Sequence, residues 1–352
     1  TLLKSFIESF SGFKYADDFI IASTYDVNDT LKKVQSYHKN KRKFDGVIAI
    51  AADVPLTVAV VSNELNLNGI PINSAEISMN KLLMKQLFAS HNIPSARFDK
   101  ICTFDEFKNQ ISQWEGPKII KPVDSRGARG VLKLTNETDL SWAWNESIKH
   151  SPSSTLIIED YLEGLQLSTE SVIINGQSFT IGYSDRNYEL LNRYAPHVIE
   201  NGSDMPSIIS EKTKIDINNT IQECAKIFRI KNGVIKGDIV INENKVKVIE
   251  IALRLSGGYF STNMIPLSTG VNLIDVAIKI ALNKTINKLD LKPRFQKFIS
   301  QRYFFPKSGT IKSMSGVTKI KENKSIKFFD IRKNIGDKIM SPTMHPSRIG
   351  MV

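Results

Sequence analysis

Among the charged residues of the stretch Gly233–Gly258, the carboxylates of Asp238 and Glu250 and the cations of Lys236 and Arg254 have spacings that could do chemistry. Magnesium prefers a few carboxylate oxygens and completes its octahedron with water and substrate phosphates. Two acids with two cations beside them therefore suit a complex of magnesium with a nucleotide. An exposed hairpin whose acids pair with its own lysines is the alternative that this stretch leaves open.

A β-hairpin is expected to bring these side chains together. The runs Val234–Ile241 and Lys245–Ala252 are rich in β-branched residues and flank the polar turn Asn242–Asn244. Asp238 and Glu250 then become opposite or diagonal neighbours, where like charges oppose pairing unless a cation lies between them. Lys236 is expected on the face of Asp238. Because strand side chains alternate, one face of the second strand is expected to carry Val248, Glu250, Ala252 and Arg254.

A glycine-rich turn, KPVDSRGARGV, follows the predicted strand Lys118–Lys121 and occupies Lys121–Val131. Gly127 and Gly130 permit backbone conformations closed to other residues, so successive amide groups could converge on a phosphate while two arginines add charge. The pattern is not a Walker A loop, which needs a Gly-Lys-Ser/Thr ending. A simple hairpin connection is the alternative.

Polar residues also follow the predicted strand Thr155–Glu159, in the sequence EDYLEGLQ. Glu159, Leu162 and Gln166 are expected at an inter-strand connection, with backbone groups and a side-chain amide free to hydrogen-bond a ligand. Farther along, Asn175-Gly176 between alternating apolar residues is typical of a type I′ hairpin. A surface hairpin with ordinary polar residues is the alternative.

The composition indicates a packed protein with an anionic partner. The chain has 352 residues, 41% of them apolar, and a net charge of +11, which favours nucleotides, phosphates or nucleic acid. Its lysines are spread out and no zinc-finger, RNP or basic-zipper motif occurs, so no nucleic-acid partner is expected. Two distant cysteines and five scattered histidines indicate neither a disulfide framework nor a zinc site. No membrane span and no signal-peptide pattern is found, and a cytoplasmic protein is predicted.

Alternating apolar and amphipathic segments predict α/β layering. Strands are expected at residues 19–22, 47–51 and 70–72, and helices at 27–38, 54–67, 79–90, 104–114, 212–228 and 273–282. In the helix 79–90, Lys81 and Lys85 share a face, and two solvated lysines are the ordinary interpretation. Short strands and loops are expected beyond Pro293. The absence of Gly-x-Gly-x-x-Gly argues against a dinucleotide site.

In this order and spacing the segments resemble the ATP-grasp superfamily, which includes carboxylate–amine ligases, biotin-carboxylase-like proteins and carbamoyl-phosphate-synthase-like proteins. The resemblance runs from about Phe19 to Leu282. It is carried by the Asn-Lys at Lys81, the KPVDSRGARGV loop, EDYLEG with Gln166 seven residues after Glu159, and the acids before ALRLSGG.

The resemblance implies an architecture: an N-terminal parallel α/β domain over residues 1–77, shortened at its start; an ATP-grasp domain over 78–285 with a lid at about 116–185; and a β-rich C-terminal extension over 286–352. ATP would be held between two antiparallel β-sheets.

The resemblance also implies roles. Contacts with ATP would come from Lys81, Lys121, Ser125, Arg126, Gly127, Ala128, Arg129, Gly130, Glu159, Asp160, Leu162 and Gln166. Asp238 and Glu250 would ligate one or two magnesium ions, or manganese in their place. Arg254 and Lys236 would be catalytic, facing the transferred phosphoryl group or the substrate carboxylate. Lys85, one turn after Lys81, is expected to be solvated. Ala252 stands where many members have Asn, which leaves the number of metal ions open.

The implied chemistry is that of an ADP-forming ligase: a substrate carboxylate attacks the γ-phosphoryl group, and an amine captures the acyl phosphate. An ATP-dependent carboxylase acting through carboxyphosphate and a non-catalytic nucleotide-binding protein are the alternatives. The expected partners are a small carboxylic acid and an amine, with no membrane, and a homodimer is left open. Specificity is expected in Ser184–Pro196 and in the tail.

Overall fold

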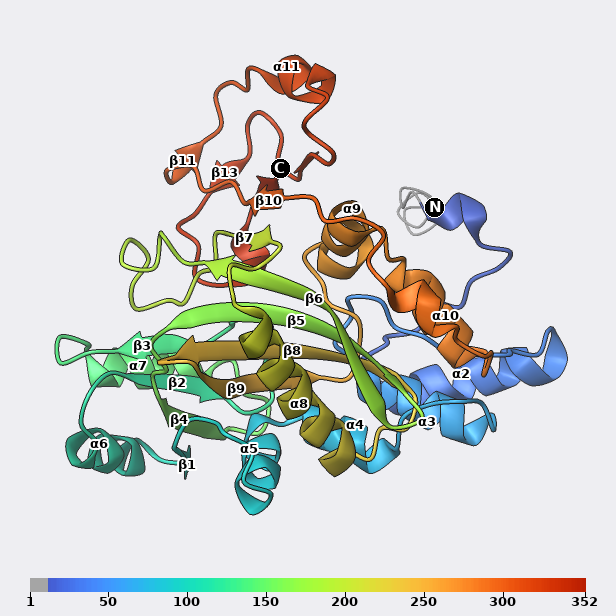
Figure 1. Ribbon diagram of the computed structural model, residues 1–352. Helices are drawn as coiled ribbons and strands as arrows, with labels where there is room; N and C mark the ends of the chain where they lie inside the picture. The colour runs from blue at the N-terminus through green and yellow to red at the C-terminus, as the bar shows by residue number, and fades with distance from the viewer. Residues whose placement is uncertain (1–11) are drawn as a thin grey trace.

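Figure 1 shows the computed structural model of the protein, which describes residues 12–352. Two antiparallel β-sheets form its centre: one of four strands in the order β1-β4-β2-β3, and one of six in the order β10-β7-β6-β5-β8-β9. This arrangement confirms the predicted pair of antiparallel sheets. The start of the domain expected over residues 1–77 lies outside the described residues, and the domain boundaries stay a prediction.

The strands of the smaller sheet are β1 (Phe98–Ile101), β2 (Lys118–Pro122), β3 (Leu132–Leu134) and β4 (Leu156–Asp160). Those of the larger sheet are β5 (Leu165–Ile174), β6 (Gln177–Asn187), β7 (Gly202–Met205), β8 (Gly233–Asn242), β9 (Lys245–Ala252) and β10 (Ile299–Arg302). The α-helices are α2 (Val27–Asn40), α3 (Pro55–Glu64), α4 (Ile72–Met79), α5 (Lys81–Ser90), α6 (Phe104–Gln113), α7 (Leu140–Ile148), α8 (Glu211–Ile227), α9 (Ile265–Thr269), α10 (Leu273–Ala281) and α11 (Val317–Glu322).

The smaller sheet is covered by α6 and α7. Phe107 of α6 and Ala143 of α7 are fully buried against Ile120 and Ile158 of the sheet. Helix α6 begins with a capping box. The Thr103 hydroxyl accepts a hydrogen bond from the Glu106 amide, and the Glu106 carboxylate accepts one from the Thr103 amide. These local signals explain why the sequence predicted the helix well.

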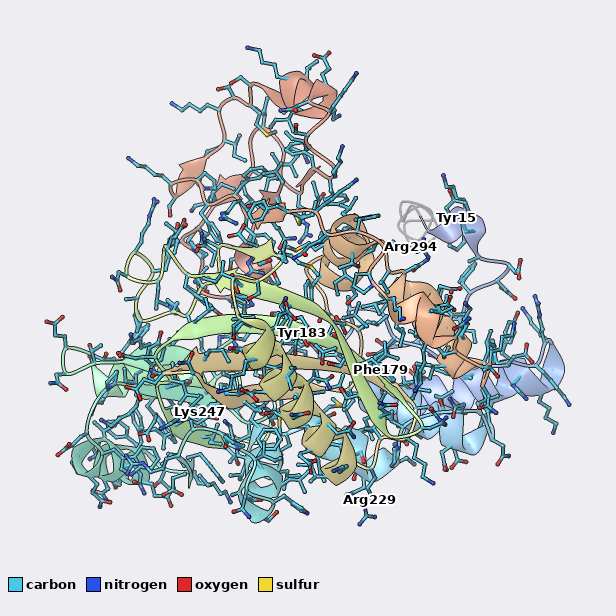
Figure 2. All side chains as sticks on the ribbon, in the orientation of Figure 1. Tyr15, Phe179, Tyr183, Arg229, Lys247 and Arg294 are labelled. Carbon is cyan, nitrogen blue, oxygen red and sulfur yellow. The ribbon has the colours of Figure 1, made fainter. Side chains whose placement is uncertain are left out.

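The larger sheet is buried on both faces. On one face, Ile221 of α8 and Phe88 of α5 pack on Ile239, and Figure 2 shows Tyr183 of β6 beneath α8, whose Lys214 carbonyl accepts from the Tyr183 hydroxyl at 3.3 Å. On the other face, α9 and α10 pack on the sheet through a second apolar cluster that includes Val172.

The N-terminal region differs from the expectation. Residues 19–22 and 47–51 form no strand, apart from a single parallel bridge between Ile50 and Leu255. Phe19 and Ile21 are half exposed, and no strand of the sheets in residues 12–352 includes this segment. Residues 70–72 are not a strand either, since α4 begins at Ile72 directly after Pro71, which has no N–H for a ladder.

Both predicted hairpins form. Asn175 and Gly176 have φ of 50° and 78°, as a type I′ turn requires, and Asp238 lies directly opposite Glu250 in the β8–β9 ladder. The prediction that Val248 shares the face of Glu250 was wrong. Ile239 pairs with Val248, so Ile249 is an extra residue that forms a bulge and turns Val248 into the core.

The C-terminal extension lies over the β7 and β10 end of the larger sheet (Figure 1). It contains the short strands β11 (Gly309–Thr310), β12 (Asp330–Ile331), β13 (Lys338–Ile339) and β14 (Gly350–Met351). Short strands were expected beyond Pro293, and β14 pairs with β12. Among residues 12–352, no helix has the length and apolar character needed to cross a membrane, and Cys102 and Cys224 are not joined in a disulfide.

Candidate functional site

A cavity of about 640 Å³ lies between the two sheets and is also lined by the N-terminal region and the C-terminal extension. Fifteen of the sixteen residues predicted for the site line it: Lys81, Lys121, Ser125, Arg126, Gly127, Ala128, Arg129, Glu159, Asp160, Leu162, Gln166, Lys236, Asp238, Glu250 and Arg254. The exception is Gly130, which is buried behind the loop next to Pro122 and Ser147. Residues that are far apart in the sequence therefore meet around one space.

The glycine-rich loop joins β2 to β3 and is held at its base and its tip. At the base, Lys81 Nζ donates to the Ser125 carbonyl at 2.5 Å. At the tip, the Gly127 carbonyl accepts from the His345 amide at 3.1 Å. Gly127 and Ala128 have φ of 64° and 58°, the left-handed conformation that glycine adopts freely. The loop is therefore both a hairpin connection and a cover over one end of the cavity.

The arginines of the loop bind protein groups in this structure. Arg126 donates to the Asp53 carbonyl at 2.8 Å and stacks on Tyr25, with 4.2 Å between its guanidinium carbon and the ring centroid. Arg129 donates to the Arg126 carbonyl at 3.1 Å. The loop thus contacts the N-terminal region as well as the extension.

Lys85 is not solvated, and that prediction was wrong. Its side chain is 1% exposed, and its ammonium lies 3.3 Å from Glu159, whose other oxygen lies 2.8 Å from Lys121. Burial opposes ionisation of Glu159, but Lys121 and Lys85 outweigh it and lower the pKa of this carboxyl. The side chain of Glu159 therefore binds two lysines beneath the cavity, which leaves its backbone for contact with a ligand.

Beyond Glu159, the chain runs along the rim of the cavity. Asp160 binds Arg97 at 3.2 Å, and this pair is about half exposed. Leu162 and Gln166 line the cavity where β4 leads into β5. This stretch connects the smaller sheet to the larger one, as expected for an inter-strand connection.

The acids of the β8–β9 hairpin face the cavity at its centre. Asp238 is in contact with Lys236 and lies 3.4 Å from Arg186. Burial alone would raise the pKa of Asp238, yet Lys236 and Arg186 lower it far below its usual value. Glu250 is its direct cross-strand partner. The two carboxylates are hard oxygen donors on one wall, which fits a divalent cation completed by phosphate oxygens.

Arg254 is held by residues that its own strand does not supply. Its Nε and Nη2 both donate to Asp53 Oδ1, with Nε at 2.7 Å. The backbone that follows is anchored by Glu170, a fully buried carboxylate that accepts from the Ser256 amide and from the Ser261 hydroxyl at 2.6 Å. Burial raises the pKa of Glu170. Asp53 was missed by the sequence reasoning, although it directly follows an apolar run.

A second charged group at the far end of the cavity was also missed. Glu200 accepts from Arg186 at 2.7 Å, and Arg348 lies 3.6 Å from the same oxygen. Tyr303 and His345 complete this end. Arg186 lies in the segment Ser184–Pro196, where specificity was expected, and it shares one face of β6 with Ser184, which also lines the cavity. The residues of the extension follow no periodic pattern.

Glu200 gives the protein a pH-dependent stability. Burial opposes its ionisation, but Arg186 and Arg348 lower its pKa from 4.5 to about 2. A carboxyl whose pKa is lower in the folded than in the unfolded chain stabilises the fold at pH values above its unfolded pKa. For Glu200 this stabilisation is lost as the pH falls from about 4.5 to about 2. At pH 7, Glu200→Gln should therefore cost about 2–3 kcal/mol of unfolding free energy.

Urea unfolding at pH 7 and at pH 3 measures this effect. The difference between Glu200→Gln and the parent should shrink at pH 3, while Glu211→Gln, at an exposed helix end, should match the parent at both. An equal loss at both pH values would contradict the ionised pair.

Comparisons with known proteins agree with this geometry. An ATP-grasp domain model matches residues 78–258, just over half of the chain. The large chain of carbamoyl phosphate synthase from Caldanaerobacter subterraneus is 22% identical over 288 residues, which cover 77% of this chain and 26% of that protein. The alanine–anticapsin ligase of Bacillus subtilis is 22% identical over 300 residues, 78% of this chain and 61% of that one. This chain thus spans from about a quarter to three fifths of these relatives.

A solved structure shows the same fold. The L-amino acid ligase from Bacillus licheniformis superposes with a TM-score of 0.77 at 20% identity, covering 93% of this chain and 78% of that one. The matched domain contains both the glycine-rich loop and the acid-bearing hairpin, the two walls of the cavity. The chain belongs to the ATP-grasp family.

Proposed function

We propose that the chain is an ADP-forming ligase that phosphorylates a carboxylic acid with Mg-ATP and joins it to an amine. One observation carries this proposal: a single cavity is lined by the glycine-rich loop and Lys121 on one side and by Asp238, Glu250 and Arg254 on the other. A nucleotide lying along the first wall would present its terminal phosphate to the second. Phosphoryl transfer needs positioning and charge stabilisation, which these side chains supply.

The metal is proposed to bind Asp238 and Glu250. In residues 12–352, no group of three or more His, Cys, Asp or Glu side chains could hold a metal ion by itself. Two carboxylates suffice for magnesium only when phosphate oxygens and water complete its coordination. Magnesium, when bound with ATP, neutralises charge on the phosphates. Lys236, which contacts Asp238, would then turn toward the transferred phosphoryl group.

The reaction has two steps. A carboxylate oxygen of the acid forms a bond to the γ-phosphorus while the bond to the β-phosphate oxygen breaks, which gives ADP and an acyl phosphate. The amine nitrogen then attacks the acyl carbon, inorganic phosphate leaves, and the nitrogen loses a proton. Arg254 would hold the reacting carboxylate with its planar fork, and the glycine-rich loop would exclude water from the acyl phosphate.

Trapping with hydroxylamine tests this proposal. Carboxylic acids are screened for ADP release with Mg-ATP, and hydroxylamine then replaces the amine so that an acyl phosphate is converted to a hydroxamate. We expect hydroxamate in proportion to ADP with the productive acid, and none with its amide. ADP release that needs bicarbonate alone would favour a carboxylase. ADP release without hydroxamate, or with the amide as substrate, would contradict the ligase mechanism.

Lys121 is expected to contribute to nucleotide affinity. Lys121→Ala should weaken binding of a non-hydrolysable ATP analogue about 10- to 100-fold, because a charge-assisted hydrogen bond to phosphate is lost. The fold should survive, since Glu159 keeps Lys85 as a partner. Calorimetry measures the affinity, and Lys133→Ala, on β3 and stacked on Tyr161, is the control. Equal affinity in mutant and parent would remove Lys121 from the site.

A further inference from the structure

One end of the cavity is built by the C-terminal extension, outside the region that the family model matches. Tyr303, His345 and Arg348 come from this extension, and Arg186 and Glu200 face them from the β6–β7 side of the larger sheet. We call these five residues the extension subsite. None of them is assigned a role in the proposed transfer of phosphate.

Arg348 is held in place, but one of its hydrogen-bond donors has no partner in residues 12–352. Its guanidinium lies 3.8 Å from the centroid of the Tyr303 ring, and its Nη2 donates to the Glu200 carbonyl at 2.7 Å. Its side chain is 11% exposed. Its Nε is out of contact with solvent and has no hydrogen-bond partner among residues 12–352. A buried donor without a partner has lost its hydrogen bonds to water without replacement, so such groups are rare in native proteins.

On two more residues that line the cavity, a buried polar atom lacks a partner in the described part of the chain: Nε2 of His345 and Oγ of Ser256. Burial and the neighbouring Arg348 lower the pKa of His345 to about 3, so its ring is neutral and adds no charge. Residues of both the extension and the Arg254 segment that carry an unsatisfied polar atom thus line one space. A ligand bound there would reach these atoms when their side chains turn toward it.

The charges indicate what kind of ligand fits. Arg186 and Arg348 both approach Glu200 Oε2, and Arg186 reaches Asp238 as its second acid. When a divalent cation takes Asp238, two guanidinium groups share one carboxylate, and the extension subsite has one surplus positive charge. A single carboxylate balances this charge, whereas a phosphate monoester would add more negative charge than the subsite can compensate.

We propose that the extension subsite binds a second carboxylate of the substrates, distinct from the carboxylate that reacts at Arg254, and that Arg348 is its specificity residue. The carboxylate could belong to the acceptor, as in an amino acid, or to a dicarboxylic acid donor. The proposal rests on the proposed function in its use of the same cavity and of a divalent cation at Asp238. Arg348, whose side chain lines the cavity, meets the carboxylate with its guanidinium, and Tyr303 holds the plane of that group.

Ligand binding, without turnover, tests this proposal. The protein with magnesium and a non-hydrolysable ATP analogue is titrated with the twenty L-amino acids and their amides, and with succinate and glutarate and their monoamides. At least one acid should bind 10-fold or more tightly than its amide. If the preferred acid is an amino acid, the second carboxylate belongs to the acceptor. If it is succinate or glutarate, the second carboxylate belongs to the donor.

Arg348→Gln should abolish the preference for the acid and leave binding of the amide unchanged. Arg348→Lys keeps the charge without the fork and should retain only part of the preference, and it serves if the glutamine variant is unstable. Arg302→Gln is the control, because Arg302 is in the same extension but binds Asp204 outside the cavity. If no acid is preferred over its amide, or if Arg348→Gln keeps the preference, the proposal is wrong. Hydroxamate formation is measured separately, so failure of the ligase mechanism is distinguished from failure of this subsite.

Discussion

Glu250→Gln is expected to lower the rate of ADP formation by about 1,000-fold or more. An amide oxygen is a weaker ligand for magnesium than a carboxylate, and a misplaced cation leaves the charge of the transferred phosphoryl group without stabilisation. The fold should not suffer, because Glu250 makes no ion pair in residues 12–352 and faces the like charge of Asp238. Turnover and melting temperature together measure the effect.

Asp238→Asn should lose the same activity but behave differently in stability. Lys236 and Arg186 both approach Asp238 and lower its pKa, so its loss leaves two cations without a partner. We therefore expect a lower melting temperature for this variant alone. Glu243→Gln, at the exposed turn of the same hairpin, should resemble the parent. Retained turnover in both Asp238→Asn and Glu250→Gln would exclude the pair as the metal site.

Arg254→Lys is expected to lower kcat/KM for the acid by about 100-fold or more. The guanidinium fork of Arg254 already contacts one carboxylate through two nitrogens, that of Asp53. A substrate carboxylate can join or replace Asp53 there, whereas an ammonium group keeps the charge but loses the two-point geometry. The KM for ATP should change little, because most of the predicted nucleotide contacts, Lys121 and the glycine-rich loop among them, lie on the opposite wall.

Steady-state kinetics with each substrate varied in turn measures this difference. Arg302→Lys, which alters an arginine–carboxylate pair outside the cavity, should match the parent. A variant that loses affinity for ATP and for the acid equally would assign Arg254 to nucleotide binding. Unchanged kinetics would remove it from the site.

Much of the site follows from short-range patterns in the sequence. The two-residue turn at Glu243 and Asn244 sets the register from Asn242–Lys245 to Ile239–Val248 and so brings Asp238 within one position of Glu250; only the bulge at Ile249 makes the two acids direct partners. The alternation of β-branched residues makes the strands, and Asn80 caps α5 so that Lys81 lies at the base of the glycine-rich loop. Each of these effects acts over a few residues, so it can be predicted without knowing the rest of the fold.

The tertiary structure alone decided which charges are buried and what they contact. Lys85 has the spacing of a solvated lysine, yet β4 brings Glu159 against it and buries both. Arg254 binds Asp53 across 201 residues, and Arg348 binds Glu200 across 148. The bulge at Ile249 likewise reverses the face of Val248. Periodicity describes one element at a time, whereas these contacts depend on how separate elements pack, and burial then sets the pKa and the partner of each charged group.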